Sequence, residues 1–304
     1  MNISLTAPLN FLSYGVIGRN ITKELCKLGH TISLWPIGQI QANQDEVPIL
    51  QQCINNQANY DRNAPSVRIF HQFSLDQHIG KSKHVGFPIF ELDAFNERAQ
   101  HHLKNQDQLL VCSKWAKQVL LENDILPSSQ ISVIPLGVDR TVFHENYPKH
   151  ERKNSTIFFV QGKIEIRKGY DVLYEIFSKA FTQKDNVELW ISWTNPFLSQ
   201  EEHNEWIRLY QNSPLGGKIK FIPWLNTQQE VAQLLNQVDC GIYLSRAEGW
   251  NLPLIETLSC GKHAIATNYS GHTEFCSKDN AWLVDITDRE IAYDGKWFTA
   301  NVGG

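Results

Sequence analysis

The sequence has no C-x-x-C pair, no long apolar run and no excess of positive charge, and each absence excludes a class of protein. The 6 cysteines are scattered, so neither a zinc site nor a disulfide framework is predicted, and reduced thiols are typical of a cytoplasmic protein. No stretch approaches the roughly 18 apolar residues of a membrane span, and the start lacks the basic and apolar regions of a signal peptide. A net charge of −4 argues against dedicated nucleic-acid binding. We therefore expect a cytoplasmic protein without a metal site.

What the sequence does have is enough apolar material for two domains. Its 304 residues are about twice the usual domain size, and 42% are hydrophobic. Short apolar runs alternate with helical patterns, which is typical of parallel strands joined by crossover helices. The segment Asp139–Asn154 is polar, lacks periodicity and contains Pro148, so the domain junction is expected there. The prediction is an α/β protein with two doubly wound domains, residues 1–145 and 146–304, facing each other across a cleft.

The apolar runs and helical patterns predict the following elements. The strands expected in the first domain are Ile3–Thr6, Ile32–Trp35, Val67–Phe70, His84–Phe90, Leu109–Cys112 and Ile131–Ile134. The helices named there are Val16–Leu28, closed by Gly29, and one capped by Ser113. The strands expected in the second domain are Ile157–Val160, Val187–Ser192, Lys218–Ile222, Cys240–Leu244 and Ala264–Thr267. Its helices are Tyr170–Phe181, Gln200–Tyr210, Gln228–Gln237 and Leu252–Cys260.

The most informative segment, SRAEGWNLPLIE, runs from Ser245 to Glu256, after a predicted buried strand and into a helix. Asn251 can cap that helix and Pro253 suits its first turn. The free backbone N–H groups at such a helix start can hold a phosphate, and Glu248 and Glu256 can bind sugar hydroxyls on either side of it. A purely structural alternative stays open: Glu256 complements the positive helix end and Glu248 is a solvated loop acid.

Four segments in order resemble motifs of the retaining GT-B nucleotide-sugar glycosyltransferases, the glycosyl transferases group 1. The segment Glu248–Glu256 has their Glu-x7-Glu spacing and looks like E-G-F-G-L-P-x-x-E. The other three are Ile134–Asp139, similar to I-P-N-G-V-D, Gly162–Gly169, similar to G-R-x-x-x-x-K-G, and Gly261–Thr267, similar to G-x-P-V-I-A-T/S. The resemblance implies a GT-B fold of two Rossmann-like domains and a hexosyltransferase active in glycan biosynthesis.

The resemblance also implies a role for each matching residue. Glu256 would bind the nucleotide ribose and Glu248 the transferred sugar, while Lys163 and Lys168 would neutralise the leaving diphosphate without a metal ion. The residues that would bind the donor are Gly15, Trp224, Gly249, Trp250, Asn251, Leu252 and Glu256. The donor would be a nucleoside diphosphate sugar, with no separate cofactor, and the acceptor a hydroxyl of a glycan, lipid or protein. The leaving phosphate would deprotonate that hydroxyl. Without the resemblance, Lys163 and Lys168 belong to a solvated positive turn.

The first domain carries weaker signals. The segment Ser13–Gly18 joins a strand region to a helix, and its glycines, among them Gly15, would let backbone approach a pyrophosphate. It lacks the G-x-G-x-x-G spacing of a dinucleotide site, so an NAD-dependent oxidoreductase is a distant alternative. Glu91 and Asp93 follow a predicted strand and are assigned to the acceptor side, although many family members carry a histidine at about this place. His71 is more simply a loop contact.

Three departures from the family pattern leave alternatives open. Lys163 replaces the arginine of the family motif, which keeps the charge but loses bidentate hydrogen bonding to phosphate. Asn251 replaces a glycine, and this is tolerated because asparagine also adopts positive φ. Members of the family usually end in a helix that crosses back onto the first domain, and no helical pattern follows Asp285. A truncated chain or an abbreviated member of the family would explain this. The alternatives are therefore a non-catalytic nucleotide or glycan binder, or a GT-B epimerase or phosphorylase. Arg19, Lys23 and Lys27 lie at helical spacing, which leaves peripheral membrane contact as an alternative, but three charges are few and a solvated helix face is the expected meaning.

Overall fold

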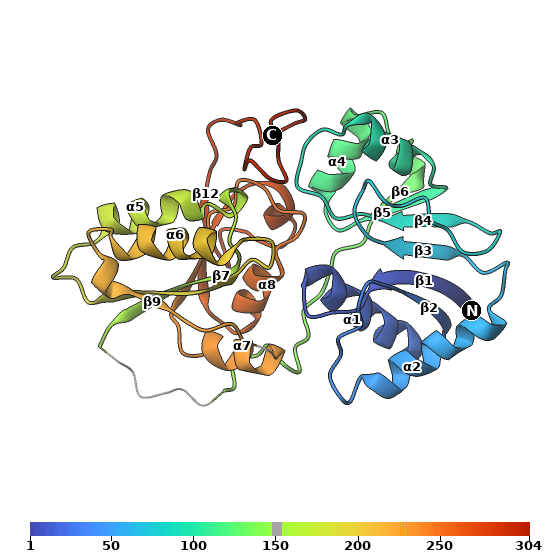
Figure 1. Cartoon of the computed structure of the whole chain (residues 1–304), viewed down its shortest axis with the longest axis horizontal. Coiled ribbons are helices and arrows are strands. Elements are labelled where there is room, and N and C mark those ends of the chain that lie inside the picture. Colours follow the sequence, from blue (N-terminus) through green and yellow to red (C-terminus); the bar gives the residue numbers. More distant parts are fainter. Residues whose placement is uncertain (148–153, 226) are drawn as a thin grey trace. The chain divides into compact units, whose positions relative to one another are not determined.

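The structure of the protein is a computed structural model that describes residues 1–147, 154–225 and 227–304. The chain forms two compact units that divide after Pro135 (Figure 1). Each unit is built on a parallel sheet covered by helices. The alternation of apolar runs and helical patterns thus led to the right fold class, an α/β chain with two doubly wound sheets.

The two units divide earlier in the chain than the boundary expected between residues 145 and 146. The reason is local packing, because Val142 and Phe143 are buried in an apolar cluster of the second unit. The sequence around Val142 and Phe143 is polar, so no apolar pattern indicated that this pair is buried. The rest of the predicted junction, residues 148–153, lies outside the described residues.

The first unit, described in full up to Pro135, has six parallel strands in the order β2-β1-β3-β4-β5-β6. The strands are β1 (Asn2–Pro8), β2 (Thr31–Ile37), β3 (Ser66–Ile69), β4 (His84–Phe87), β5 (Gln108–Val111) and β6 (Ile131–Val133). The helices are α1 (Ser13–Lys27), α2 (Val47–Asn55), α3 (Glu97–Lys104) and α4 (Lys114–Glu122), with short 3-10 turns η1 (Asn56–Asn59) and η2 (Ser128–Gln130). In Figure 1, α1 and α2 lie along β1 and β2, whereas α4 lies along β5 and β6.

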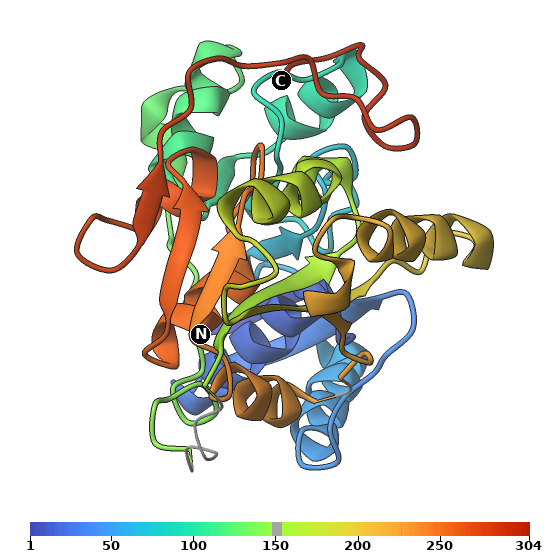
Figure 2. The same cartoon turned by 90° about the vertical axis from the view of Figure 1, so that its left-hand side faces the viewer.

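The second unit has, within residues 154–225 and 227–304, six parallel strands in the order β12-β11-β10-β7-β8-β9. The strands are β7 (Thr156–Lys163), β8 (Val187–Thr194), β9 (Ile219–Phe221), β10 (Cys240–Tyr243), β11 (His263–Thr267) and β12 (Trp282–Val284). The helices are α5 (Tyr170–Ala180), α6 (Gln200–Gln211), α7 (Gln228–Leu235) and α8 (Leu252–Ser259), with 3-10 turns η3 (Ile166–Lys168), η4 (Gly216–Lys218) and η5 (Ser270–Glu274). Figure 2 shows β10, β11 and β12 running side by side.

The central strand β7 is apolar on both faces because helices cover both. Ile157 and Phe159 pack in the cluster that contains α7, whereas Phe158 and Val160 pack in the cluster that contains α5 and α6. Successive side chains of a strand point to opposite faces, so four apolar residues in a row require a covered sheet on each side. The prediction of a doubly covered parallel sheet is confirmed.

The helix boundary signals in the sequence were also correct. Ser113 caps α4, its hydroxyl accepting from the Ala116 N–H at 3.1 Å. Gly29 follows α1 with φ of 81°, the left-handed conformation predicted for it. The stretch from Asp285 to Gly304, described throughout, contains no helix. It has only an isolated antiparallel bridge between Tyr293 and Thr299.

The differences from the predicted elements have simple causes. The strand expected to reach Phe90 ends at Phe87, because Pro88 has no N–H to donate to the ladder. The helix α3 was not named because its turns are polar, with only Ala99, His102 and Leu103 buried. The strand β12 was missed because it is three residues long and holds its place by backbone pairing to β11.

Candidate active site

The strand order of the second sheet reverses between β7 and β10. The chain winds from β7 outward to β9, then returns to β10 on the other side of β7. In doubly wound sheets, ligands bind outside the carboxyl ends of the strands at such a point. The strand β7 ends at Lys163, and the segment 244–251 follows β10. The two segments are in contact, because the Arg246 N–H donates to the Arg167 carbonyl at 2.7 Å.

The segment after β10 leads into α8 through a sharp backbone turn. Asn251 is the N-cap in the left-handed region, with φ of 82°, and its Oδ1 accepts from the Leu254 N–H at 3.3 Å. The cap, the first-turn Pro253 and the positive φ of Asn251 were all predicted. The N–H groups of Trp250, Asn251 and Leu252 make no hydrogen bond within the described part of the chain. Free amides at a helix start bind anions.

Glu248 is buried in this turn and carries its charge. Its side chain is paired with Arg167 at 2.9 Å and with Lys168 at 2.6 Å, and it accepts from the Ser245 hydroxyl at 2.8 Å. Burial alone would raise the pKa of Glu248, but the charges of Arg167 and Lys168 outweigh it and hold the pKa well below its usual range. Glu248 is only 5% exposed, so it is not a solvated loop acid.

The basic turn between β7 and α5 supplies the positive charge. Lys163 pairs with Glu165 at 2.5 Å, and Arg167 bridges Glu165 at 2.8 Å and Glu248. Three cations and two carboxylates make up this network, so these five groups carry one excess positive charge. Arg167 was not assigned to the site from the sequence. The structure makes it a direct partner of Glu248.

Glycine at position 169 is required by the geometry of this turn. Gly169 has φ of 75°, and a Cβ on it would lie 2.4 Å from the Leu244 carbonyl oxygen. The basic turn therefore packs directly on the backbone that follows β10. This close approach keeps Lys168 beside Glu248.

The short turn η5 supports the backbone of the segment 244–251 through hydrogen bonds to Glu248. The Ser270 hydroxyl accepts from the Glu248 N–H at 2.8 Å, and the Gly271 N–H donates to the Glu248 carbonyl at 2.9 Å. A Cβ on Gly271 would lie 2.5 Å from the Gly249 carbonyl oxygen, so glycine is needed there. Sequence reasoning missed this support, since η5 lies about twenty residues downstream.

Glu256 differs sharply from Glu248. It is 9% exposed, and within the residues that the structure describes no hydrogen bond or ion pair holds its carboxylate. Burial raises its pKa from 4.5 to about 7. The helix begins at Leu252, so Glu256 lies beyond the first turn and the expectation that it complements the positive helix end is wrong. The site thus holds one fixed carboxylate and one that lacks a partner.

The glycines of the segment Ser13–Gly18 lie within α1 rather than in a loop before it. A Cβ on Gly15 would lie 2.2 Å from the Asn10 nitrogen, and one on Gly18 would lie 2.3 Å from the Pro8 carbonyl oxygen. The close approach of the segment after β1 therefore explains both glycines without a ligand. A donor contact at Gly15 stays a prediction.

The first sheet has its own switch point, between β1 and β3, and three side chains gather at its carboxyl edge. The Tyr14 hydroxyl donates to the Ile89 carbonyl at 2.6 Å and accepts from the Ile89 N–H at 3.1 Å. The His71 ring lies 4.8 Å from the Tyr14 ring. Burial, and next the charge of Glu91, raise the pKa of Tyr14 well above its usual value. Tyr14 was missed by sequence reasoning, whereas Glu91 lies at the predicted edge.

Two predicted residues lie apart from these clusters. Asp93 is in the segment before α3, where its carbonyl accepts from the Asn123 side chain at 2.9 Å. Trp224 follows β9, which β8 separates from β7, and it is 41% exposed. Their roles toward acceptor and nucleotide base stay predictions.

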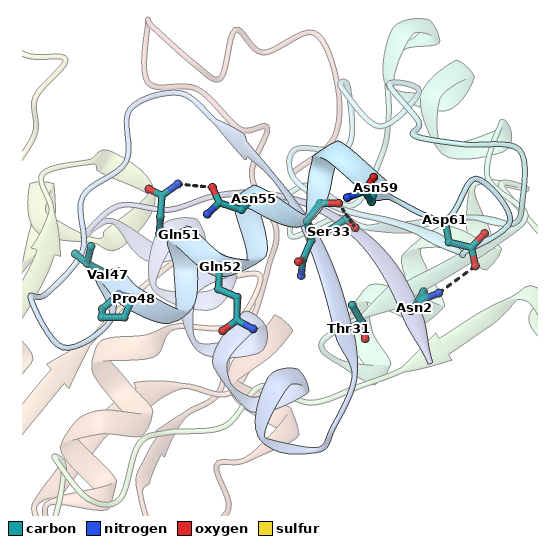
Figure 3. A pocket seen from close by; sticks show the side chains of 11 residues that line it. Asn2, Thr31, Ser33, Val47, Pro48, Gln51, Gln52, Asn55, Asn59 and Asp61 are labelled. Atoms are coloured by element: carbon teal, nitrogen blue, oxygen red, sulfur yellow. Dashed lines mark hydrogen bonds between the residues drawn. The ribbon is translucent and has the colours of Figure 1, made fainter.

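A cavity of about 670 Å³ lies at the opposite edge of the first sheet (Figure 3). Asn2 and Thr31, the first residues of β1 and β2, line it together with Gln51, Gln52 and Asp61. Most of its lining residues have amide or hydroxyl side chains, and the lining includes one carboxylate and no cation. This cavity therefore does not suit an anion and is separate from the carboxyl edge of its sheet.

Metal-binding clusters and membrane-spanning helices are both absent from the part of the chain that the structure describes. Within it, no group of three or more histidine, cysteine, aspartate or glutamate side chains is arranged to hold a metal ion. No described helix combines the length and the apolar character needed to cross a membrane.

The two parallel six-stranded sheets and their strand orders define a protein of the GT-B fold. Solved structures show the same architecture. Sucrose-phosphate synthase from Thermosynechococcus elongatus aligns with a TM-score of 0.70 at 15% identity, covering 95% of this chain and 86% of that one. Anabaena Alr3699/HepE in complex with UDP-glucose aligns with a TM-score of 0.67 at 13% identity, covering 94% and 85%.

The family model described as glycosyl transferases group 1 matches residues 142–294, half of the chain, and the chain belongs to this family. The phosphatidylinositol N-acetylglucosaminyltransferase GPI3 subunit of Saccharomyces cerevisiae is 25% identical over 57% of this chain and 38% of its own length. The GDP-mannose-dependent alpha-(1-6)-phosphatidylinositol dimannoside mannosyltransferase of Mycobacterium tuberculosis is 23% identical over 62% of this chain and 48% of its own. The match thus spans less than half of either relative.

Proposed function

We propose that this protein is a retaining glycosyltransferase that moves a hexose-type sugar from a nucleoside diphosphate sugar to a hydroxyl acceptor without a metal ion. One observation carries the proposal. The switch point of the second sheet combines free helix-start amides, the cations Lys163, Arg167 and Lys168, and the partnerless carboxylate of Glu256. A nucleoside diphosphate offers the complementary groups: a diphosphate for the amides and cations, and a ribose diol for Glu256.

Each residue has a separate task in this proposal. The N–H groups of Trp250, Asn251 and Leu252 bind the diphosphate, and Lys163 and Lys168 stabilise the charge that develops on it as it leaves. Glu256 accepts hydrogen bonds from the ribose hydroxyls, which supply the partners that its carboxylate lacks.

Glu248 orients the transferred sugar. Its two cationic neighbours keep it ionised, so it can only accept hydrogen bonds, which suits sugar hydroxyls. Because these cations lower the pKa of Glu248, its carboxylate takes up a proton poorly and is a weak general base. The leaving phosphate then deprotonates the acceptor hydroxyl on the same face of the sugar, and the protein contributes positioning and electrostatics.

The relatives support a nucleotide-sugar donor. A structural neighbour is titled as a complex with UDP-glucose, and a curated relative is named for its use of GDP-mannose. The two names differ in base, sugar and acceptor, so we propose the donor class alone. The six free cysteines fit a cytoplasmic location.

The first test is a calorimetric titration of the purified chain with UDP, GDP, ADP and NAD, each in EDTA and again in magnesium. Binding of one nucleoside diphosphate with equal affinity in EDTA and magnesium supports the proposal and identifies the base for a sugar and acceptor screen. Binding that requires magnesium contradicts the metal-independent mechanism. Binding of NAD alone contradicts the donor assignment altogether. Nucleotide binding without any sugar turnover would identify a binder that kept the fold.

A further inference from the structure

His272 lies next to the proposed phosphate-binding turn, and both of its ring nitrogens have hydrogen-bond partners. The side chain belongs to η5 and is 1% exposed. Its Nδ1 lies 3.0 Å from the Thr267 carbonyl oxygen, and its Nε2 lies 2.8 Å from the Asn251 side-chain nitrogen. The Asn251 Oδ1 in turn accepts from the Leu254 N–H. A continuous chain of hydrogen bonds therefore runs from β11 through His272 and Asn251 to the start of α8.

The partners at the two ends of this chain determine its direction. A carbonyl oxygen can only accept, so the His272 Nδ1 must carry a hydrogen toward Thr267. A backbone N–H can only donate, so Asn251 must turn its oxygen toward Leu254 and its NH₂ group toward His272. The Nε2 must then accept, and the ring is neutral with its hydrogen on Nδ1. With a hydrogen on Nε2 as well, two donors would face each other.

Asn251 needs this support because of its backbone conformation. Its backbone φ is 82°, a value that residues other than glycine rarely adopt. The motif that this segment resembles has glycine here, which has no side chain to hold. In this chain the asparagine both caps α8 and must be kept in one orientation to do so, and the only described partner of its NH₂ group is His272.

We propose that His272 is a positioning residue of the donor site: its neutral Nδ1–H form holds Asn251 in the orientation that keeps the first amides of α8 ready for a diphosphate. This inference rests on the proposed function, because it assigns the diphosphate to those amides. It adds a residue from outside the segments that resemble the family motifs.

The surroundings of His272 favour the neutral ring. Burial lowers the pKa of His272, and the positive charges of Lys168 and Arg167 act in the same direction. The negative charge of Glu248 and the hydrogen bond to the Thr267 carbonyl oppose them, but the pKa stays below its usual value.

The test is a double-mutant cycle between positions 272 and 251. The variants are His272→Leu, His272→Gln, Asn251→Gly and Asn251→Gly with His272→Leu. The probes are UDP-glucose, GDP-mannose and ADP-glucose, titrated in EDTA, with circular dichroism to show that each variant is folded. His272→Leu is expected to weaken binding roughly ten-fold, about the effect of one lost buried hydrogen bond. His272→Gln, whose amide oxygen can accept from Asn251, is expected to restore most of it. In the Asn251→Gly background the same leucine is expected to have less than about a two-fold effect.

A second readout needs no ligand. Ring-¹⁵N spectra of histidine-labelled protein at neutral pH should show His272 as the Nδ1–H tautomer. An Nε2–H tautomer or an imidazolium would overturn the inference, as would a loss from His272→Leu that is equally large in the Asn251→Gly background. If the wild-type protein binds none of the three donors, the proposed function fails and this inference with it. If the wild-type protein and His272→Leu bind equally well, only this inference fails.

Discussion

Replacing Glu256 by glutamine should stabilise the protein at alkaline pH while damaging its donor site. The pKa of the buried Glu256 is about 7, against 4.5 for an ordinary glutamate, and burial is the cause. One pH unit of pKa difference corresponds to about 1.4 kcal/mol, so ionising Glu256 in the folded protein costs roughly 3 kcal/mol. Because the folded-state pKa is the higher one, stability is fully present below about pH 4.5 and is lost as the pH rises to about 7. Glutamine has the same shape and no charge to bury.

The assay is urea unfolding of the wild-type protein and Glu256→Gln at pH 5 and pH 8. We expect the two proteins to have similar free energies of unfolding at pH 5 and the variant to be more stable by about 2 to 3 kcal/mol at pH 8. Glu46→Gln is the matched control. Glu46 is also buried but pairs with Arg19 and Lys23, which lower its pKa against the effect of burial. Removing its charge should therefore destabilise the protein at pH 8. A Glu256→Gln variant that is less stable than the wild type at pH 8 would refute the reasoning.

Three further predictions concern binding and the turns of the second unit. Affinity of the wild-type protein for a nucleotide sugar should rise as the pH passes through about 7, since ribose hydroxyls bind an ionised Glu256 better; calorimetry should show no such rise for Glu256→Gln. Glu248→Ala should leave nucleoside diphosphate affinity nearly unchanged and abolish sugar transfer, whereas Glu256→Ala should weaken nucleotide binding at least about ten-fold. Equal and negligible effects of both alanine variants would contradict the assigned roles. Gly169→Ala should lower the free energy of unfolding by about 2 kcal/mol or more, because its Cβ would meet the Leu244 carbonyl; urea unfolding with no measurable change would show that the turn can move.

Much of the fold was readable from local pattern. The run from Ile157 to Val160 predicted a strand covered on both faces, and Ser113 and Gly29 marked helix ends through hydrogen-bonding and φ requirements that act within a few residues. The prediction was wrong where the local signal was weak. The helix α3 buries only a few side chains, and β12 is held by pairing to a neighbouring strand, which no local pattern reports.

From local pattern alone, the site was predictable only as far as its residues lie in one segment, and Lys163 and Lys168 were assigned to it through the family resemblance. Glu248, Asn251 and the start of α8 share a short stretch, and their spacing indicated a phosphate-binding turn. Arg167, Ser270 and His272 reach the same turn from about 80 residues upstream or about twenty downstream, and nothing in their own surroundings predicts that.

By itself the sequence determined the class of fold, the capped turn before α8 and the pair of carboxylates on its two sides, because helix capping and strand burial are local properties. Only the tertiary structure decided how those carboxylates differ. Glu248 is ionised because two cations from another segment pair with it. Glu256 takes up a proton near neutral pH because it is buried and no cation pairs with it. A charge depends on everything packed around it, and packing brings together residues that the sequence keeps apart.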